Sequence, residues 1–223
     1  MKFILDGTSS AGKTTILNEF PDTLIKVAGD DILNEKPKDF YKTLENKYYS
    51  DKQIDKIYFN AYYSKIANRV LHKKDFGIDI VHFMTGEPDI YKYLPKDTKK
   101  ILVYSNLEKL TDNINKRNNY SPREVNNVFR QFYIYYTITN DKSTAIDKID
   151  RKSFIKILET YVKYKFTSKK HLIEFAHKIF KSMNITDDNT YYIKPKYNHY
   201  DYILITKNKT PTMLKNEILT IFK

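Results

Sequence analysis

The sequence predicts an α/β fold in which helices flank a parallel sheet. Short apolar segments of strand length alternate with amphipathic segments of helix length along most of the 223 residues, and this alternation is typical of parallel sheets. The pattern begins with a strand at residues 2–6, a turn with two glycines, and a helix at 14–20 that Pro21 ends. A chain of this length accommodates one such domain, so we expect a single domain over residues 1–223.

The turn at residues 7–14 reads Gly-Thr-Ser-Ser-Ala-Gly-Lys-Thr and fits the phosphate-binding pattern G-x-x-x-x-G-K-[ST] at every fixed position. In this pattern the glycines let backbone amides point at phosphates, the lysine reaches the terminal phosphates, and the following hydroxyl holds Mg²⁺. The predicted fold is therefore a P-loop NTPase of the nucleoside or nucleotide kinase-like type, with ATP and Mg²⁺ as cofactors. The predicted nucleotide-binding residues are Gly7, Thr8, Ser9, Ser10, Ala11, Gly12, Lys13, Thr14 and Thr15.

A pair of carboxylates follows the second predicted strand, at residues 23–28. Asp30 and Asp31 are expected at the carboxyl edge of the sheet, where open α/β sheets bind ligands. One could accept the proton of a substrate hydroxyl while the other holds Mg²⁺. The structural alternative for one of them is a cap on the helix that starts at Ile32.

The strand predicted at residues 77–84 has the length and position of the strand that carries the second acidic motif of P-loop proteins. Asp79 comes early in this predicted strand, and His82 occupies its end. Glu87 and Asp89 follow in the loop. The sequence alone therefore assigns no magnesium ligand to this strand, and His82 is better explained as a hydrogen-bonded residue of the sheet rim than as a ligand.

Arginine is rare in this chain, with five among 39 basic residues, and three of the five lie between positions 117 and 130. Guanidinium groups grip phosphate oxygens well because they donate two parallel hydrogen bonds. Ser-Pro-Arg-Glu at 121–124 predicts a capping box and a helix after it. We therefore predict that Lys13, Arg117, Arg123 and Arg130 act on the transferred phosphoryl group, the arginines from a closing lid. The alternative is coincidence with ordinary carboxylate partners.

Much of the net charge of +12 lies in residues 151–181, which hold nine basic and two acidic residues. Two amphipathic helices are expected within a basic, mainly helical insertion at 140–197, before a last strand at 200–206 and a last helix at 211–223. The insertion could dock nucleic acid. The alternative is that lysine serves throughout this lysine-rich chain as the default solubilising residue.

The chain contains no Cys, which excludes disulfides and thiolate metal sites. No apolar run approaches the roughly 20 residues that span a bilayer, and no signal-peptide pattern precedes the first strand. We therefore expect a cytoplasmic protein with no membrane partner.

The loop at residues 7–14 resembles the G-x-S-S-A-G-K-[ST] loop of chloramphenicol phosphotransferase-like kinases. Three further segments are similar to that family: Gly29-Asp30-Asp31-Ile32-Leu33, Asn106-Leu107-Glu108 with Arg117, Arg123 and Gln131, and Tyr200-Asp201-Tyr202. The similarity covers residues 1–139 and 198–223. It implies that Asp31 deprotonates the acceptor hydroxyl, which leaves Asp30 and Thr14 as the expected magnesium ligands. His82-Phe83 departs from the family, which has acidic residues there.

These observations favour an ATP-dependent phosphotransferase that transfers the γ-phosphate to a hydroxyl of a small molecule. One alternative is a polynucleotide or nucleotide kinase whose basic insertion binds nucleic acid. The other is a nucleotide-binding module without transfer activity, which the irregular acidic strand at 77–84 suggests.

Overall fold

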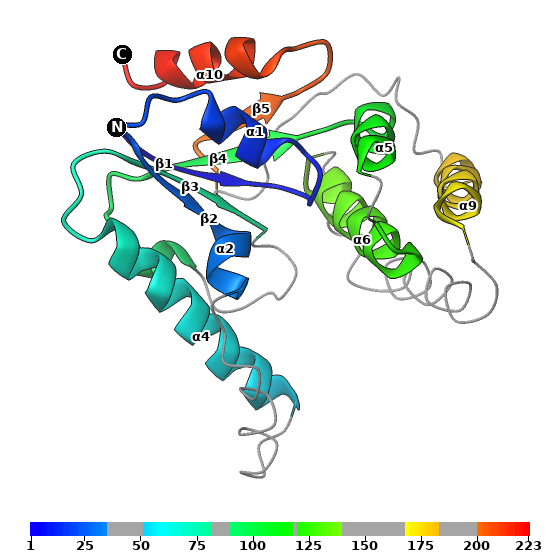
Figure 1. Cartoon of the computed structure of the whole chain (residues 1–223), viewed down its shortest axis with the longest axis horizontal. Coiled ribbons are helices and arrows are strands. Elements are labelled where there is room, and N and C mark those ends of the chain that lie inside the picture. Colours follow the sequence, from blue (N-terminus) through cyan, green and yellow to red (C-terminus); the bar gives the residue numbers. More distant parts are fainter. Residues whose placement is uncertain (35–50, 82–89, 118–119, 140–167, 183–199) are drawn as a thin grey trace.

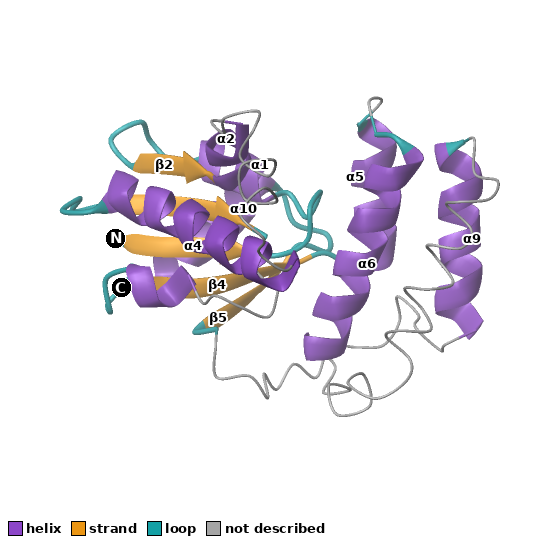
Figure 2. Ribbon diagram, turned by 90° about the horizontal axis from the view of Figure 1, so that it is seen from below, coloured by secondary structure: helices purple, strands orange, loops and turns teal. Residues whose placement is uncertain are grey.

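Five parallel strands form the sheet around which the chain is arranged (Figures 1 and 2). The computed structural model describes residues 1–34, 51–81, 90–117, 120–139, 168–182 and 200–223. The strands are β1 (Lys2–Asp6), β2 (Ile25–Ala28), β3 (Phe76–Ile80), β4 (Lys99–Tyr104) and β5 (Tyr202–Ile205). Their order is β2-β3-β1-β4-β5, and every adjacent pair is parallel, which confirms the predicted fold class.

The side chains of β1 alternate between the two faces of the sheet, as a pleated strand requires. Phe3 and Leu5 pack in one apolar cluster with α1 (Lys13–Asn18) and α10 (Pro211–Thr220). Ile4 packs on the opposite face with α4 (Asp51–Val70) and the short 3₁₀ helix η1 (Ile90–Tyr93). Both faces of the sheet are therefore buried, and this burial is the main force that holds the fold.

Three helices form a separate layer beyond the carboxyl end of the sheet: α5 (Leu107–Lys116), α6 (Pro122–Thr139) and α9 (Lys169–Ser182). They lie beside one another next to the point where β1 leads into the loop (Figures 1 and 2). Their facing side chains share a third apolar cluster, in which Phe180 of α9 packs against Phe129 and Phe132 of α6. The helix α9, which the sequence assigned to an insertion, is thus packed against α5 and α6.

Several predicted boundaries are reproduced. The capping box forms, because the Ser121 amide donates to Glu124 Oε2 at 2.6 Å and the Glu124 amide donates to Ser121 Oγ at 3.3 Å. Helix α10 begins at the expected proline, with Thr210 accepting a hydrogen bond from the Met213 amide. The sequence also predicts a short helix at 37–47, which begins at Pro37. This segment and most of the insertion at 140–197 lie outside the described residues.

Most other boundaries differ from the predictions by a few residues at their ends, and two of these differences bear on the site. Strand β3 ends at Ile80 rather than at residue 84, and α2 (Gly29–Asn34) begins before Ile32, so that it includes Asp30 and Asp31. Over the ranges that the structure describes, no helix is both long enough and apolar enough to cross a membrane.

Candidate active site

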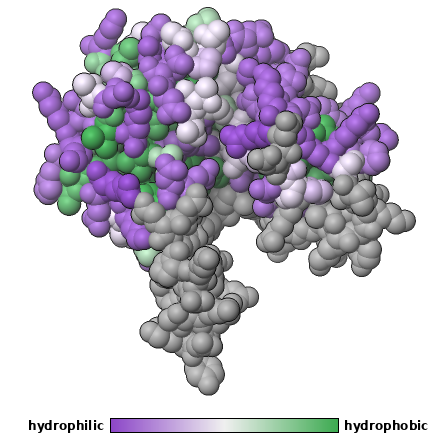
Figure 3. All heavy atoms as spheres, viewed as in Figure 1, coloured by the Kyte–Doolittle hydropathy of each residue, from purple (hydrophilic) through white to green (hydrophobic). Residues whose placement is uncertain are grey.

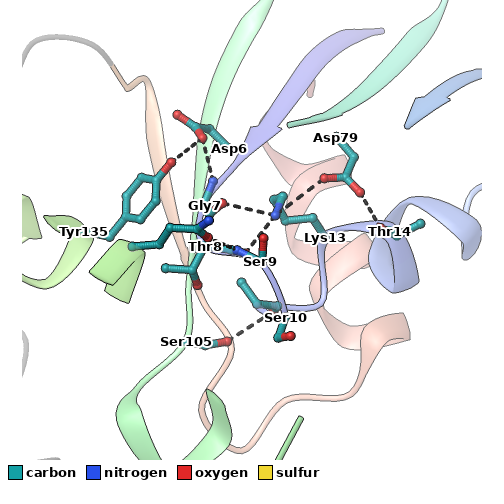
Figure 4. A network of polar contacts seen from close by, with 12 residues as sticks. Asp6, Gly7, Thr8, Ser9, Ser10, Lys13, Thr14, Asp79, Ser105 and Tyr135 are labelled. Atoms are coloured by element: carbon teal, nitrogen blue, oxygen red, sulfur yellow. Dashed lines mark hydrogen bonds and ion pairs between the residues drawn. The ribbon is translucent and has the colours of Figure 1, made fainter. Parts of the chain in front are cut away.

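The loop between β1 and α1 has the tight backbone that a phosphate cradle requires. Gly7 and Gly12 have φ angles of 150° and 93°, and Ser10 between them has a φ angle of 65°. Gly12 is the N-cap of α1. The residues predicted to bind the nucleotide thus form one continuous turn from the end of β1 into α1 (Figure 4).

Lys13 is buried and folds back onto this turn. Its Nζ donates to the carbonyl oxygens of Gly7 at 3.1 Å and Thr8 at 2.8 Å. The same ammonium lies 3.6 Å from Oδ1 of Asp79. The cation is therefore held in the loop before any ligand binds, in surroundings where its charge is only weakly screened.

Asp79 is the acidic residue that the sequence analysis did not place. Its Oδ1 faces Lys13 and its Oδ2 accepts a hydrogen bond from Thr14 Oγ1 (Figure 4). The prediction that Asp79 comes early in its strand was wrong, because β3 ends at Ile80. Asp79 is the second-last residue of β3, and it pairs in register with Leu5 and Ala28. His82 lies outside the described residues.

A cavity of about 110 Å³ opens between the loop, β3 and α2. Six of the nine predicted nucleotide-binding residues line it: Ser9, Ser10, Gly12, Lys13, Thr14 and Thr15. Asp79 and Arg117 line it as well. The cavity thus combines cations, hydroxyls and carboxylates at the carboxyl edge of the sheet, which is the expected ligand position in an open α/β sheet.

The two carboxylates after β2 differ in their relation to this cavity. Both are exposed, but Asp30 lines the cavity, whereas Asp31 is not among its lining residues. Successive residues of a helix point about 100° apart, so one member of such a pair faces the site and the other faces away. The structure therefore brings Asp30 to the loop and leaves Asp31 outside.

Tyr62 of α4 forms the wall of the cavity behind Gly29 and Asp30. Burial raises the pKa of the Tyr62 hydroxyl well above its usual range, and the nearby Tyr63, Asp30 and Asp79 raise it further. The hydroxyl consequently stays neutral even above about pH 10, where an exposed tyrosine ionises. From the sequence, the spacing of the apolar residues from Ile54 to Val70 predicts only that Tyr62 lies on the apolar face of a helix.

Of the three predicted arginines, the structure places the side chain of one. Arg117 lines the cavity, and its Nη1 donates to the hydroxyl of Tyr120 at 2.6 Å. That hydroxyl in turn lies 3.0 Å from Oγ of Ser10 in the loop. Arg123 and Arg130 lie in α6, but their side chains are outside the described part of the chain.

A second cavity of about 350 Å³ lies on the other side of the loop. It shares Ser10, Gly12, Thr15 and Arg117 with the first. Its walls are apolar at Ile16 and Leu214 and basic at Lys109, Lys116, Arg117 and Lys209. Together the two cavities give the loop a ligand space on each side, and Arg117 borders both.

Side chains from distant elements also hold the loop. Gln131 Oε1 of α6 accepts from the Ser9 amide at 2.6 Å. Asn113 Nδ2 of α5 donates to the Ser10 carbonyl at 2.8 Å, and Ser105 Oγ donates to the Ala11 carbonyl at 3.1 Å. Asn113 and Ser105 were not predicted as site residues, because only the fold brings them to the loop.

Asp6, the last residue of β1, is fully buried and anchors the start of the loop. Its Oδ1 accepts from the Gly7 amide at 2.7 Å and from the Tyr135 hydroxyl at 2.6 Å. Its Oδ2 accepts from the Tyr200 hydroxyl at 2.6 Å. The Tyr200 hydroxyl can donate this hydrogen bond only while it is neutral. Burial and the Asp6 charge raise the pKa of this hydroxyl well above its ordinary value of 10.0.

We expect this tyrosine to make the fold sensitive to alkali. A folded-state pKa above the unfolded value contributes stability that is complete below about pH 10 and is lost as pH rises beyond it. Urea denaturation between pH 8 and pH 11 should therefore show a smaller pH-dependent loss of stability for Tyr200→Phe than for the wild type. Tyr93→Phe, an exposed tyrosine whose hydroxyl donates to Asn60, is the control. If the free energy of unfolding fell equally with pH in all three proteins, the expectation would be contradicted.

The donor set of the first cavity suits Mg²⁺. Within the described ranges, no three His, Asp or Glu side chains gather into a ready-made metal site. Mg²⁺ in phosphate-transferring sites takes only one or two protein carboxylates and completes its shell with phosphate and water oxygens. Thr14, Asp79 and Asp30 offer hard oxygen ligands of this kind beside the loop.

Neither a protein-family model nor a curated protein matches the sequence. Among solved structures, the chain is similar to a gluconokinase from Sinorhizobium meliloti 1021, with 14% identity and a TM-score of 0.38. The match covers 53% of this chain and 66% of the gluconokinase, which is just under two thirds of the gluconokinase's length. It is also similar to a sugar kinase from Janibacter sp. HTCC2649, with 14% identity, a TM-score of 0.42 and coverage of 59% and 76%. A shikimate kinase from Acinetobacter baumannii gives 10% identity, a TM-score of 0.43 and coverage of 99% and 92%. At these identities the likeness concerns the fold alone, and the resemblance to chloramphenicol phosphotransferase-like kinases stays a prediction.

Proposed function

We propose that this chain is an ATP- and Mg²⁺-dependent kinase that phosphorylates a hydroxyl group of a small molecule. The observation that carries the proposal is the meeting of Lys13, Thr14 and Asp79 in one contact network, with Asp30 lining the same cavity. A phosphate-binding loop alone would account for nucleotide binding. A further carboxylate beside the loop adds a group that can accept a proton from an attacking hydroxyl.

Each residue of this network has a definite task in the proposed reaction. When bound, ATP supplies the phosphoryl group and Mg²⁺ neutralises charge on its phosphates. Lys13, which now donates to the loop carbonyls, would neutralise the terminal phosphates, and Thr14 and Asp79 would hold the metal. Asp30 accepts the proton of the acceptor hydroxyl. The hydroxyl oxygen bonds to the γ-phosphorus of ATP, and the bond from this phosphorus to the bridging oxygen breaks, so that ADP leaves. Most of the acceleration then comes from positioning and from fixed charges.

This assignment moves the role of base from Asp31 to Asp30, and the carboxylate that holds the metal becomes Asp79. Asp31 was expected to be the base and Asp30 a metal ligand, but only Asp30 lines the cavity. Arg117 keeps its expected role of neutralising the phosphoryl group, because it borders the spaces on both sides of the loop. Arg123 and Arg130 remain proposed lid residues on the strength of their sequence positions.

The pair Asp30 and Asp31 provides a matched test. A panel of sugars, antibiotics, nucleosides, nucleotides and 5′-hydroxyl oligonucleotides is incubated with γ-labelled ATP and the wild type, Asp30→Asn or Asp31→Asn. We expect Asp30→Asn to lower transfer by about 10²–10⁴-fold, the usual contribution of a general base, while ATP binding is kept. Asp31→Asn should stay close to the wild type, because it alters a carboxylate that does not line the cavity.

The other outcomes of this panel are equally informative. A loss confined to Asp31→Asn would move the base to Asp31. Labelling of nucleotides or oligonucleotides alone would favour the nucleotide or polynucleotide kinase alternative. If ATP binds but no acceptor is labelled, the chain is a nucleotide-binding module and the kinase proposal fails.

A further inference from the structure

Lys169, the first residue of α9, reaches across to the end of α5. Its Nζ donates to the carbonyl oxygens of Ile114 at 2.7 Å, Asn115 at 3.2 Å and Arg117 at 3.0 Å. An ammonium group has three protons to donate, so these three acceptors use its full capacity. Lys169 was counted in the basic stretch that could dock nucleic acid, and this arrangement gives it an internal partner instead.

The three carbonyls lie at the carboxyl end of α5, where a nearby cation stabilises a helix. The last carbonyls of an α-helix have no partner within the helix, and they carry the negative end of its dipole. Helix α5 ends at Lys116, and Arg117 is its C-cap with an extended backbone. The carbonyls of Ile114 and Arg117 also accept from the amides of Arg117 at 3.1 Å and Tyr120 at 3.4 Å. The bonds from Lys169 thus add to the contacts that set the direction in which the chain leaves the helix.

The residue held in this way, Arg117, is one of the four that border both ligand cavities. The Arg117 side chain is exposed, and its guanidinium contacts the Tyr120 hydroxyl, which lies against Ser10 of the loop. Long exposed side chains lose conformational entropy when they are held in one place. The bond from Lys169 already orders the backbone of Arg117. Only the side-chain torsions of Arg117 then remain to be ordered when it meets a ligand.

Helix α9, which carries Lys169, is held against α5 and α6 by apolar packing and by a polar contact. Leu172 and Ala176 are completely buried in the cluster shared with α5 and α6. His177 Nε2 lies 2.9 Å from Thr111 Oγ1 of α5, which gives a second polar contact between the two helices. The remaining lysines of α9, Lys170, Lys178 and Lys181, are exposed, on a side of the molecule where hydrophilic residues predominate (Figure 3).

We infer that Lys169 is a positioning residue, which holds the carboxyl end of α5 so that Arg117 faces the phosphate-binding loop. This inference rests on the proposed function, because it gives Arg117 the task of meeting phosphate. It also gives α9 a role in the site, although no part of α9 lines either cavity.

The test compares Lys169→Met with Lys170→Met, its exposed neighbour, by calorimetric titration with Mg²⁺-ATP. We expect Lys169→Met to weaken ATP binding about tenfold, Lys169→Arg to recover most of the loss, and Lys170→Met to change affinity less than about twofold. In an Arg117→Ala background, Lys169→Met should cause no further loss, because the effect passes through Arg117. An unchanged affinity for Lys169→Met, or a full additional loss in that background, would overturn the inference.

A second measurement covers variants that fold poorly and separates this inference from the proposed function. Lys169→Gln keeps two donors, and amide exchange at Arg117 and Tyr120, followed by NMR, reports the order of this segment without a ligand. We expect faster exchange at both amides in Lys169→Gln than in Lys170→Gln. Equal exchange would overturn the positioning role even if ATP binds, whereas faster exchange with no ATP binding by the wild type would remove the proposed function and keep the role in ordering the segment.

Discussion

Replacing Lys13 with methionine is expected to abolish measurable phosphoryl transfer from ATP, with a loss of at least about 10²–10³-fold, the usual effect of removing one preorganised electrostatic contact. Methionine retains the apolar stem and removes only the charge. That charge is buried against the Gly7 and Thr8 carbonyls and lies 3.6 Å from Asp79. Among the described residues, Lys13 is the one lysine that lines the first cavity.

The same substitution should affect stability much less than activity. Asp79 loses a buried cation but keeps the hydrogen bond from Thr14, and breaking a buried ion pair costs up to about 3–5 kcal/mol when the remaining charge has no other partner. Because Thr14 remains, we expect a smaller cost and a folded protein by circular dichroism. The double variant Lys13→Met/Asp79→Asn should recover stability without recovering activity.

Lys74→Met is the control for Lys13→Met, because Lys74 is exposed and lies outside both cavities. Its transfer rate and its thermal midpoint should match those of the wild type. Transfer by Lys13→Met at the wild-type rate would exclude the loop as the phosphate site and the proposed function with it.

The loop was predictable from the sequence, but its acidic partner was not, for a physical reason. A loop motif is local: its glycines, lysine and threonine have fixed spacing, and the strand and helix around it can be recognised nearby. The end of β3 depends on its neighbours. Val81 continues an apolar run, yet β3 stops at Ile80 because its partner β1 ends at Asp6, opposite it, and then turns into the loop. Only this pairing places Asp79 beside Thr14.

The contacts around the loop were hidden for a related reason. Amphipathic spacing predicts which face of a helix is buried, but it does not predict which element that face meets. Tyr135 therefore had no predicted role, and Gln131 was named only through the family resemblance, until the fold brought them to Asp6 and Ser9. Lys169 shows the same limit, since its charge predicted a solvated surface while its partners lie on another helix.

The two glycines of the loop should respond very differently to replacement by alanine. At Gly7, with a φ angle of 150°, an added Cβ would overlap the carbonyl oxygen of Val103 in β4. That oxygen belongs to the backbone of a central strand and cannot move aside cheaply. We expect Gly7→Ala to destabilise the fold by about 2–5 kcal/mol, from backbone strain together with overpacking.

Gly12→Ala is the matched comparison within the same motif. Gly12 has a φ angle of 93° and a left-handed backbone, but an added Cβ would meet nothing within 4 Å. Its cost should be the conformational strain alone, about 1–2 kcal/mol. Urea denaturation of both variants measures the difference, and equal losses would mean that the approach of the loop to β4 does not set the requirement for glycine. A larger loss for Gly7→Ala would mean that one glycine is needed for the space beside β4 and the other for the turn into α1.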